Sequence, residues 1–176
     1  MSEFQRATAS PLFLRDAELR RSIELLYFAY RDFVGEADRL LNAQGLGRAH
    51  HRALYFIARQ EGLHVGALLE ILQISKQSLA RVLRQLLDQE LVRQEAKSSD
   101  RRRRQLYLTD SGRDLERQLV AAQKHLLGRA YKGLAPEAIK GFHQVLINMI
   151  QDKTQAYRYD AAQKRDTVQE HDATQE

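Results

Sequence analysis

The chain has 176 residues and a net charge of +5, which fits one soluble domain with an anionic partner. It contains no cysteine, which excludes disulfide bonds, thiolate zinc sites and iron–sulfur clusters. No stretch approaches the roughly 18 apolar residues of a membrane helix, and the polar N-terminus has no signal-peptide core. We therefore expect a cytoplasmic protein with no membrane partner.

The first half of the chain is predicted to form four helices, because its apolar residues are spaced by three and four. A tight turn at Gln73 and Ile74 separates the last two. Ser75 is a good N-cap for the fourth helix, since its hydroxyl can accept a hydrogen bond from a free backbone N–H. The four helices are expected over residues 16–43, 48–61, 66–72 and 76–89.

The apolar period changes after the fourth helix. Residues 91–96 and 104–109 are short and partly alternating, which predicts a β-hairpin. A long helix is expected from Thr109 or Asp110, and a last helix from Pro136. The resulting order is four helices, a hairpin and two helices, a mainly α fold with a small β wing.

The positive charge is concentrated in one region. Residues 75–104 hold nine basic and four acidic residues, so their net charge equals the +5 of the whole chain. Residues 159–176 carry a net charge of −3 and few large apolar residues, and we expect them to form a disordered tail. A local basic surplus is typical of a nucleic-acid contact, although many basic runs are ordinary solvated faces.

The third and fourth helices have the spacing of a helix-turn-helix. The open side of the fourth helix carries side chains that suit DNA, because arginine pairs with guanine, glutamine with adenine and serine with either. No acidic residue occurs between Ser75 and Leu87. The residues on this open side are Lys76, Gln77, Ser78, Arg81, Arg84 and Gln85. Ser75, the expected N-cap, is also expected to contact DNA.

The hairpin adds to this interpretation. Residues 100–104 place arginines at or beside its tip, from which an arginine can enter a minor groove. Asp100 opposes DNA binding unless it holds a neighbouring arginine in a bidentate pair. A helix-turn-helix followed by a basic hairpin is the winged form of the motif.

An ordered set of segments resembles the MarR family of transcriptional regulators, from about Glu18 to Gln151. The segments that carry the resemblance are residues 54–57, 74–83, 100–102 and 108–112. Residues 47–59 and 75–86 also resemble the PetP-like branch of that family. The chain departs from the family where Gln73 and Glu90 replace common glycines, which puts the geometry of those two turns in doubt.

The resemblance implies a winged helix-turn-helix homodimer that binds palindromic DNA and is released by a small effector. Residues 12–45 and 113–158 would form a helical dimerisation region, and residues 46–112 the DNA-binding domain. Asp100 would pair with Arg102, and Arg102 would reach the minor groove. The composition of the terminal helices also favours a dimer, because their apolar stripes would otherwise form a large exposed patch. The alternative is a bundle of the same helices within one chain.

An effector pocket is a further expectation, at the junction of the dimerisation helices and the winged domain. An aromatic or anionic ligand, such as an aromatic carboxylate, would suit its tyrosines and basic residues. The alternative is that the tyrosines and phenylalanines belong to the core, and that the arginines are surface residues or phosphate contacts. The residues expected to line the pocket are Tyr27, Tyr30, Arg31, His51, Arg52 and Tyr55.

The sequence offers little for an enzyme. The six histidines form no zinc-binding pattern, and no phosphate-binding glycine loop or nucleophile elbow is present. We therefore expect no cofactor, no metal and no catalytic residue.

The sequence as a whole predicts a regulator, with repression as the expected activity, that binds double-stranded DNA as a homodimer. Gln77, Ser78 and Arg81 are expected to read bases, and the phosphate contacts are expected to be Lys76, Arg84 and Arg103. Two alternatives stay open. One is a winged helix that docks proteins, and the other is a non-specific architectural DNA binder.

Overall fold

The computed structural model describes residues 15–97 and 100–151, and it describes side chains within 15–95 and 104–151. The expected tail over residues 159–176 lies outside these ranges. The helices are α1 (Asp16–Asn42), α2 (Arg48–Arg59), α3 (Val65–Leu72), α4 (Lys76–Asp88), α5 (Asp110–Tyr131) and α6 (Pro136–Met149). The strands are β1 (Leu63–His64), β2 (Val92–Lys97) and β3 (Asp100–Leu108).

The predicted mainly α fold with a β-hairpin wing is confirmed, with two differences in the sheet. The two-residue strand β1 pairs antiparallel with β3, so the sheet has the order β1-β3-β2. Such a short strand has no alternation for a sequence pattern to detect. The hairpin is also longer than predicted, because β3 begins at Asp100 rather than at Arg104.

The chain divides into two compact units, Met1–Leu126 and Leu127–Glu176. The first unit contains α1 to α4, the sheet and most of α5. The second contains the end of α5 and α6, where the Tyr131 ring makes edge contacts with the rings of Phe142 and His143.

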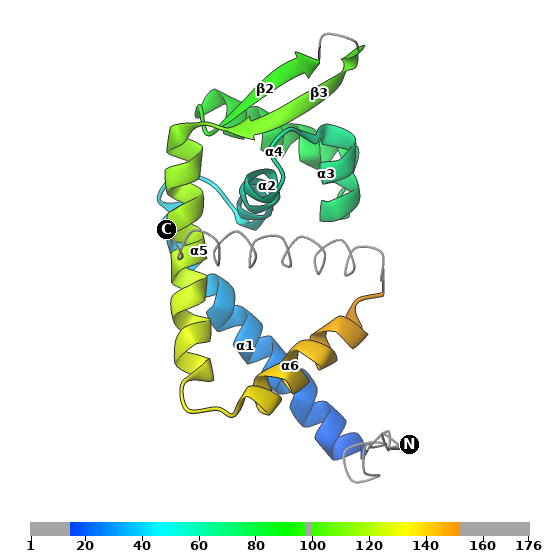
Figure 1. Cartoon of the computed structure of the whole chain (residues 1–176), viewed down its shortest axis with the longest axis vertical. Helices are drawn as coiled ribbons and strands as arrows, with labels where there is room; N and C mark the ends of the chain where they lie inside the picture. Colours follow the sequence, from blue (N-terminus) through cyan, green and yellow to red (C-terminus); the bar gives the residue numbers. More distant parts are fainter. Residues whose placement is uncertain (1–14, 98–99, 152–176) are drawn as a thin grey trace, which may run out of the picture. The chain divides into compact units, whose positions relative to one another are not determined.

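A leucine-rich core holds the first unit together. Helices α2, α3 and α4 lie together beside the β2–β3 hairpin (Figure 1). Their inward side chains are almost fully buried, and each contributes roughly 1.5–3 kcal/mol to folding. The largest fully buried side chains are Leu41, Leu54, Ile57, Leu63, Leu68, Leu72, Leu79, Leu86, Leu106 and Leu119.

A close backbone contact joins the hairpin to the start of α5. The Thr109 hydroxyl donates to the Glu90 carbonyl oxygen at 2.6 Å and accepts a hydrogen bond from the Gly112 N–H at 3.0 Å. The Thr109 N–H also donates to the Leu91 carbonyl at 3.1 Å. A Cβ at position 112 would overlap the Leu91 carbonyl oxygen, so only glycine allows α5 to begin this close to the wing.

The two turns that lack the family's glycines keep a left-handed backbone. Gln73 has φ 53° and Glu90 has φ 54°. A left-handed conformation costs a residue with a Cβ roughly 1–2 kcal/mol. Each strained turn is held by a hydrogen bond, from the Gln73 amide to the Glu70 carbonyl oxygen at 2.9 Å and from Thr109 to the Glu90 carbonyl oxygen. Gln73 and Glu90 therefore both adopt a backbone conformation that favours glycine.

Helix α2 begins with an unusual cap. Gly47 is the N-cap residue, and its N–H donates to Nδ1 of His50 at 3.0 Å. A protonated imidazole has hydrogen on both nitrogens and cannot accept this bond. Burial lowers the pKa of His50, and it also lowers the pKa of the adjacent His51.

We predict that Gly112→Ala destabilises the protein by more than about 2 kcal/mol, because a methyl group must displace the Leu91 backbone. Gly128→Ala is the matched control, since it lies on the same helix and an added Cβ there meets nothing within 4 Å. That change should stabilise the helix by up to about 1 kcal/mol. Urea unfolding measures both, and a similar small effect of the two substitutions would contradict the close contact.

The His50 cap leads to a second prediction, on how the unfolding free energy depends on pH. The folded protein binds the His50 proton more weakly than the unfolded chain, whose histidine pKa is near 6.5. Stability is therefore complete above that value and is lost as the pH falls below it toward the folded pKa. We expect His50→Gln to lose less unfolding free energy than the wild type between about pH 7.5 and 5.5, since glutamine keeps an acceptor but does not titrate. Parallel pH profiles in urea unfolding would exclude the titrating cap.

Candidate nucleic-acid interface

Helix α4 presents one buried and one open side. The Ser75 hydroxyl accepts from the Ser78 N–H at 3.1 Å and donates to the Ser78 hydroxyl at 2.9 Å, which confirms Ser75 as the N-cap. Leu79, Val82, Leu83 and Leu86 are buried. The expected DNA contacts on the opposite side are all exposed: Lys76, Gln77, Ser78, Arg81 and Arg84.

The basic residues of this open side are not neutralised. Within the part of the chain that the structure describes, no carboxylate is paired with Lys76, Arg81 or Arg84. Their charges are therefore available to an anion in solution. Gln85, which the sequence pattern places on the same side, is instead half-buried, and its amide donates to the Gly45 carbonyl oxygen at 2.8 Å.

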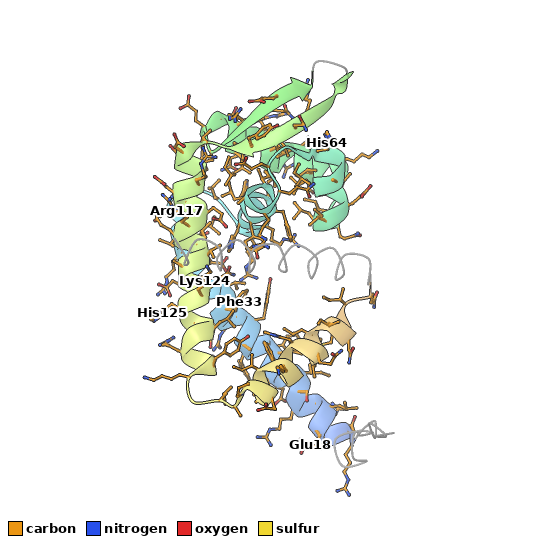
Figure 2. All side chains as sticks on the ribbon, viewed as in Figure 1. Glu18, Phe33, His64, Arg117, Lys124 and His125 are labelled. Carbon is orange, nitrogen blue, oxygen red and sulfur yellow. The ribbon has the colours of Figure 1, made fainter. Side chains whose placement is uncertain are left out.

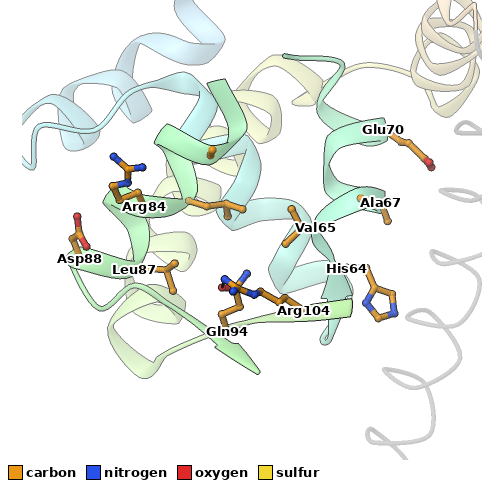
Figure 3. Close-up of a pocket in the computed structure, with 12 residues that line it drawn as sticks. His64, Val65, Ala67, Glu70, Arg84, Leu87, Asp88, Gln94 and Arg104 are labelled. Atoms are coloured by element: carbon orange, nitrogen blue, oxygen red, sulfur yellow. Dashed lines mark hydrogen bonds between the residues drawn. The ribbon is translucent and has the colours of Figure 1, made fainter. Parts of the chain in front are cut away.

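A groove of about 810 Å³ lies between α3, α4 and the hairpin (Figure 3). Its apolar surface includes Val65, Leu83 and Leu87. Arg84 of α4 and Arg104 of β3 both line it, and the Arg104 guanidinium donates to the Gln94 side-chain oxygen at 3.2 Å. The wall also includes carboxylates, Glu70 and Asp88. Guanidinium groups on two elements of one groove suit a phosphate backbone, because each can donate two parallel hydrogen bonds to phosphate oxygens.

Sequence reasoning did not single out Arg104 from its neighbours, or Gln94 at all. The signal lies in the strand register, because Gln94 pairs with Leu106 and Ala96 with Arg104. Side chains alternate between the two faces of a strand, so Gln94 and Arg104 lie on the same face of the hairpin as the buried Leu106. That face is turned toward α4.

On the other face of the hairpin, Arg93 interacts with neighbouring side chains of the hairpin itself. Arg93 forms an ion pair with Glu95, and its guanidinium lies 4.6 Å from the centroid of the Tyr107 ring. This arginine is therefore partly neutralised, in contrast to Arg81. The expected contacts Asp100, Arg102 and Arg103 lie in β3 by their backbone, but their side chains are outside the described set.

The residues expected to form an effector pocket are only partly brought together. His51 is buried with 8% of its surface exposed, and Tyr55 is half-buried with its ring edge-on to Phe56. Tyr27 is 71% exposed and Tyr30 is 55% exposed.

The arginines of this proposed pocket have different surroundings. Arg31 forms an ion pair with Asp32, and Arg52 is exposed. None of the six residues expected to bind an effector lines the groove beside α4. None of them lines a second cavity either, which has a volume of about 180 Å³ and lies beside Glu116.

Helices α1 and α2 are linked by a polar cluster near this region. The Arg48 guanidinium donates to Asp38 Oδ2 through Nε at 2.9 Å and through Nη2 at 2.7 Å. It also lies 5.5 Å from the centroid of the Tyr30 ring. The pair fixes the start of α2 against α1.

The two terminal helices carry large apolar surfaces. Every residue of α1 from Leu19 to Asp32 is exposed, a stretch that lies between Glu18 and Phe33 in Figure 2. Helix α6 has no buried residue. The exposed apolar side chains of the two helices and of the residue that caps α6 include Leu19, Ile23, Leu26, Tyr27, Phe28, Phe142, Val145, Leu146, Met149 and Ile150.

None of the helices within the described ranges is long and apolar enough to cross a membrane. No group of three or more histidine, aspartate or glutamate side chains there is arranged to hold a metal ion.

Known proteins resemble the chain in sequence and in fold. A model of the MarR family matches residues 44–103. The HTH-type transcriptional regulator PetP of Rhodobacter capsulatus is 48% identical over 139 residues, which cover 79% of this chain and 84% of that protein.

Solved structures share the fold at lower identity. The MarR family regulator SP03579 has a TM-score of 0.67 at 16% identity, over 88% of this chain and 99% of its own. A mutant of MepR from S. aureus bound to an oligodeoxyribonucleotide has a TM-score of 0.53 at 20% identity, over 73% of this chain and 94% of its own.

The resemblance seen in the sequence is thus confirmed by a relative that matches across most of both chains. Together with the winged helix-turn-helix and its open basic helix, this match shows that the chain belongs to the MarR family of transcriptional regulators.

Proposed function

We propose that this protein is a repressor that binds an inverted-repeat operator as a homodimer and is released by a small effector. The observation that carries the proposal is the exposed side of α4, which has unpaired basic residues and no acidic residue before Asp88 at its end. Its buried side anchors it in the core, so the same side chains always face outward. A binding protein of this kind acts on DNA in the cytoplasm and needs no catalytic residue.

The proposed contacts follow from positions along α4. A recognition helix places its N-terminal residues against base edges in the major groove. Gln77, Ser78 and Arg81 are therefore assigned to bases. Lys76 at the helix start and Arg84 at the groove are assigned to phosphates, because they flank the base-reading positions.

The wing is assigned to the flanking DNA. The groove beside α4 would receive one phosphate backbone, with Arg104 and Arg84 on two of its walls. Arg103 would add a phosphate contact near the tip. Arg102 would enter the minor groove, held at its angle by Asp100.

The exposed apolar surfaces support a homodimer. Soluble monomers rarely expose large contiguous apolar patches, and a second copy of the chain offers the same surfaces by symmetry. A two-fold axis would place two α4 helices about one DNA turn apart, which explains an inverted repeat. A dimer that covers such a site beside a promoter excludes other proteins from it, which is repression in its simplest form.

The effector remains assigned to the region around His51 and Tyr55. The buried His51 and the half-buried Tyr55 lie on α2 beside the Asp38–Arg48 link to α1. An aromatic carboxylate bound there would compete with Asp38 for Arg48, and so would alter the attachment of α2 to α1.

The operator used here is one that the protein selects from a pool of random duplexes. We predict that Arg81→Ala weakens binding to this selected operator by about 1–3 kcal/mol and relaxes preference at one base pair per half-site. Arg93→Ala is the matched control, because it removes the same charge from an arginine already paired with Glu95. Arg84→Ala should weaken specific and random duplexes alike and lower the salt slope by about one. Fluorescence titration at several salt concentrations measures all three. Equal losses for Arg81→Ala on specific and random DNA would show that Arg81 only contacts the backbone.

We also predict that the wild type is a dimer at micromolar concentration and that Ile23→Asp is a monomer. Ile23 is 51% exposed in the single chain, and a carboxylate there would be buried without a partner in a dimer. Arg21→Asp, on an exposed neighbouring position of α1, is the control and should stay dimeric. Sedimentation velocity gives the masses, and circular dichroism checks that helix content is kept. A monomeric wild type would contradict the homodimer.

A further inference from the structure

Two glutamine side chains tie α4 to the loop between α1 and α2. The Gln85 amide donates to the Gly45 carbonyl oxygen at 2.8 Å, and the Gln89 amide donates to the Gln44 carbonyl oxygen at 3.2 Å. Residues four apart on a helix lie on the same side, so the two bonds act together on adjacent carbonyls. Both come from the C-terminal end of α4, away from Gln77, Ser78 and Arg81, the residues assigned to bases.

The loop that receives these bonds is itself well anchored. Its backbone N–H groups at Gln44 and Leu46 donate to the Leu41 carbonyl oxygen, each at 2.9 Å. Leu41 and Leu46 on either side of it are buried. Gly45 takes φ 69°, which favours glycine, and this conformation presents its carbonyl to Gln85. The loop is therefore a fixed point for α4.

The same loop leads into the cap of α2. Gly47 is two residues beyond Gly45, and its N–H donates to His50. The end of α1, the start of α2 and the end of α4 thus meet in one polar cluster around residues 44–50. The Gln85 and Gln89 amides connect this cluster to α4.

We propose that Gln85 and Gln89 are positioning residues, which set the angle of α4 on the α1–α2 loop and so control DNA affinity without touching DNA. The proposal rests on the assignment of α4 as the DNA-reading helix. Gln77 lies eight residues from Gln85, which is about 12 Å along the helix. A tilt of about 5° at Gln85 displaces Gln77 by about 1 Å, which is enough to break a bidentate hydrogen bond to a base.

The two bonds are not what keeps α4 folded. The helix is held by four buried apolar side chains, from Leu79 to Leu86. A hydrogen bond between partly exposed neutral groups adds only a modest net free energy, because water replaces it on opening. Their removal should therefore change the orientation of α4 more than the stability of the fold.

The test is the double variant Gln85→Met and Gln89→Met in the full chain, since methionine keeps side-chain length and removes the amide. Gln118→Met, at an exposed position of α5, is the control for the same chemical change. Affinities are measured for the selected operator and for a random duplex, at several salt concentrations. We expect the double variant to lose about tenfold on the operator, as two weak hydrogen bonds allow, with random-duplex affinity and salt slope unchanged.

Three outcomes would overturn the positioning role. A lower salt slope would make the glutamines phosphate contacts. A preference lost only at a base pair that Gln77, Ser78 and Arg81 do not read would make them base contacts. Unchanged affinity on both duplexes, with a lower unfolding free energy, would make them purely structural.

A DNA-free arm separates this proposal from the proposed function. Hydrogen exchange, followed by mass spectrometry, should be faster in the double variant over the loop at residues 43–46 and over the C-terminal half of α4. A wild type that prefers no duplex would refute the proposed function. The exchange rates alone would then show whether Gln85 and Gln89 hold α4 on the α1–α2 loop. Exchange equal to the wild type in both segments would overturn the positioning role.

Discussion

The interface depends on the burial of one side of α4. Leu79, Val82, Leu83 and Leu86 pack into the core, and this sets the rotation of the helix about its axis. Adjacent residues on a helix point about 100° apart, so a turn by one residue would bury Arg81 and expose Val82. Both changes cost free energy, because the Arg81 charge would lose its hydration and the apolar Val82 side chain would be exposed to water. The choice of exposed residues is therefore made by the core.

The position of α4 and of the wing depends on fewer, more local contacts. The wing is attached where Thr109 and Gly112 bring the start of α5 against the Glu90–Leu91 turn. The far end of α4 is attached to the α1–α2 loop by Gln85 and Gln89. The groove between them takes its shape from both attachments, with Arg84 on one wall and Arg104 on another. Strong burial thus selects the face, and weaker polar contacts set its angle.

Local patterns in the sequence were sufficient for the order of helices, the Ser75 cap and the hairpin. Each depends on residues within a few positions of one another, where period and cap chemistry carry the information. The features that local patterns did not predict depend on contacts with residues far along the chain. Strand β1 exists only because Leu63 pairs with Leu106, and the Gln85 amide bonds to a carbonyl forty residues away. The left-handed Glu90 is held by Thr109, a contact that no local pattern contains.

The central claim is that the open side of α4 lies in the major groove. Guanine N7 is exposed there, so its methylation by dimethyl sulfate reports contact in that groove directly. On an operator selected from random duplexes, the protein should protect guanine N7 in two segments about 10 bp apart, and Arg81→Ala should restore the reactivity of one guanine in each. Protection of the sugar–phosphate backbone with guanine N7 fully reactive throughout the site would contradict the account.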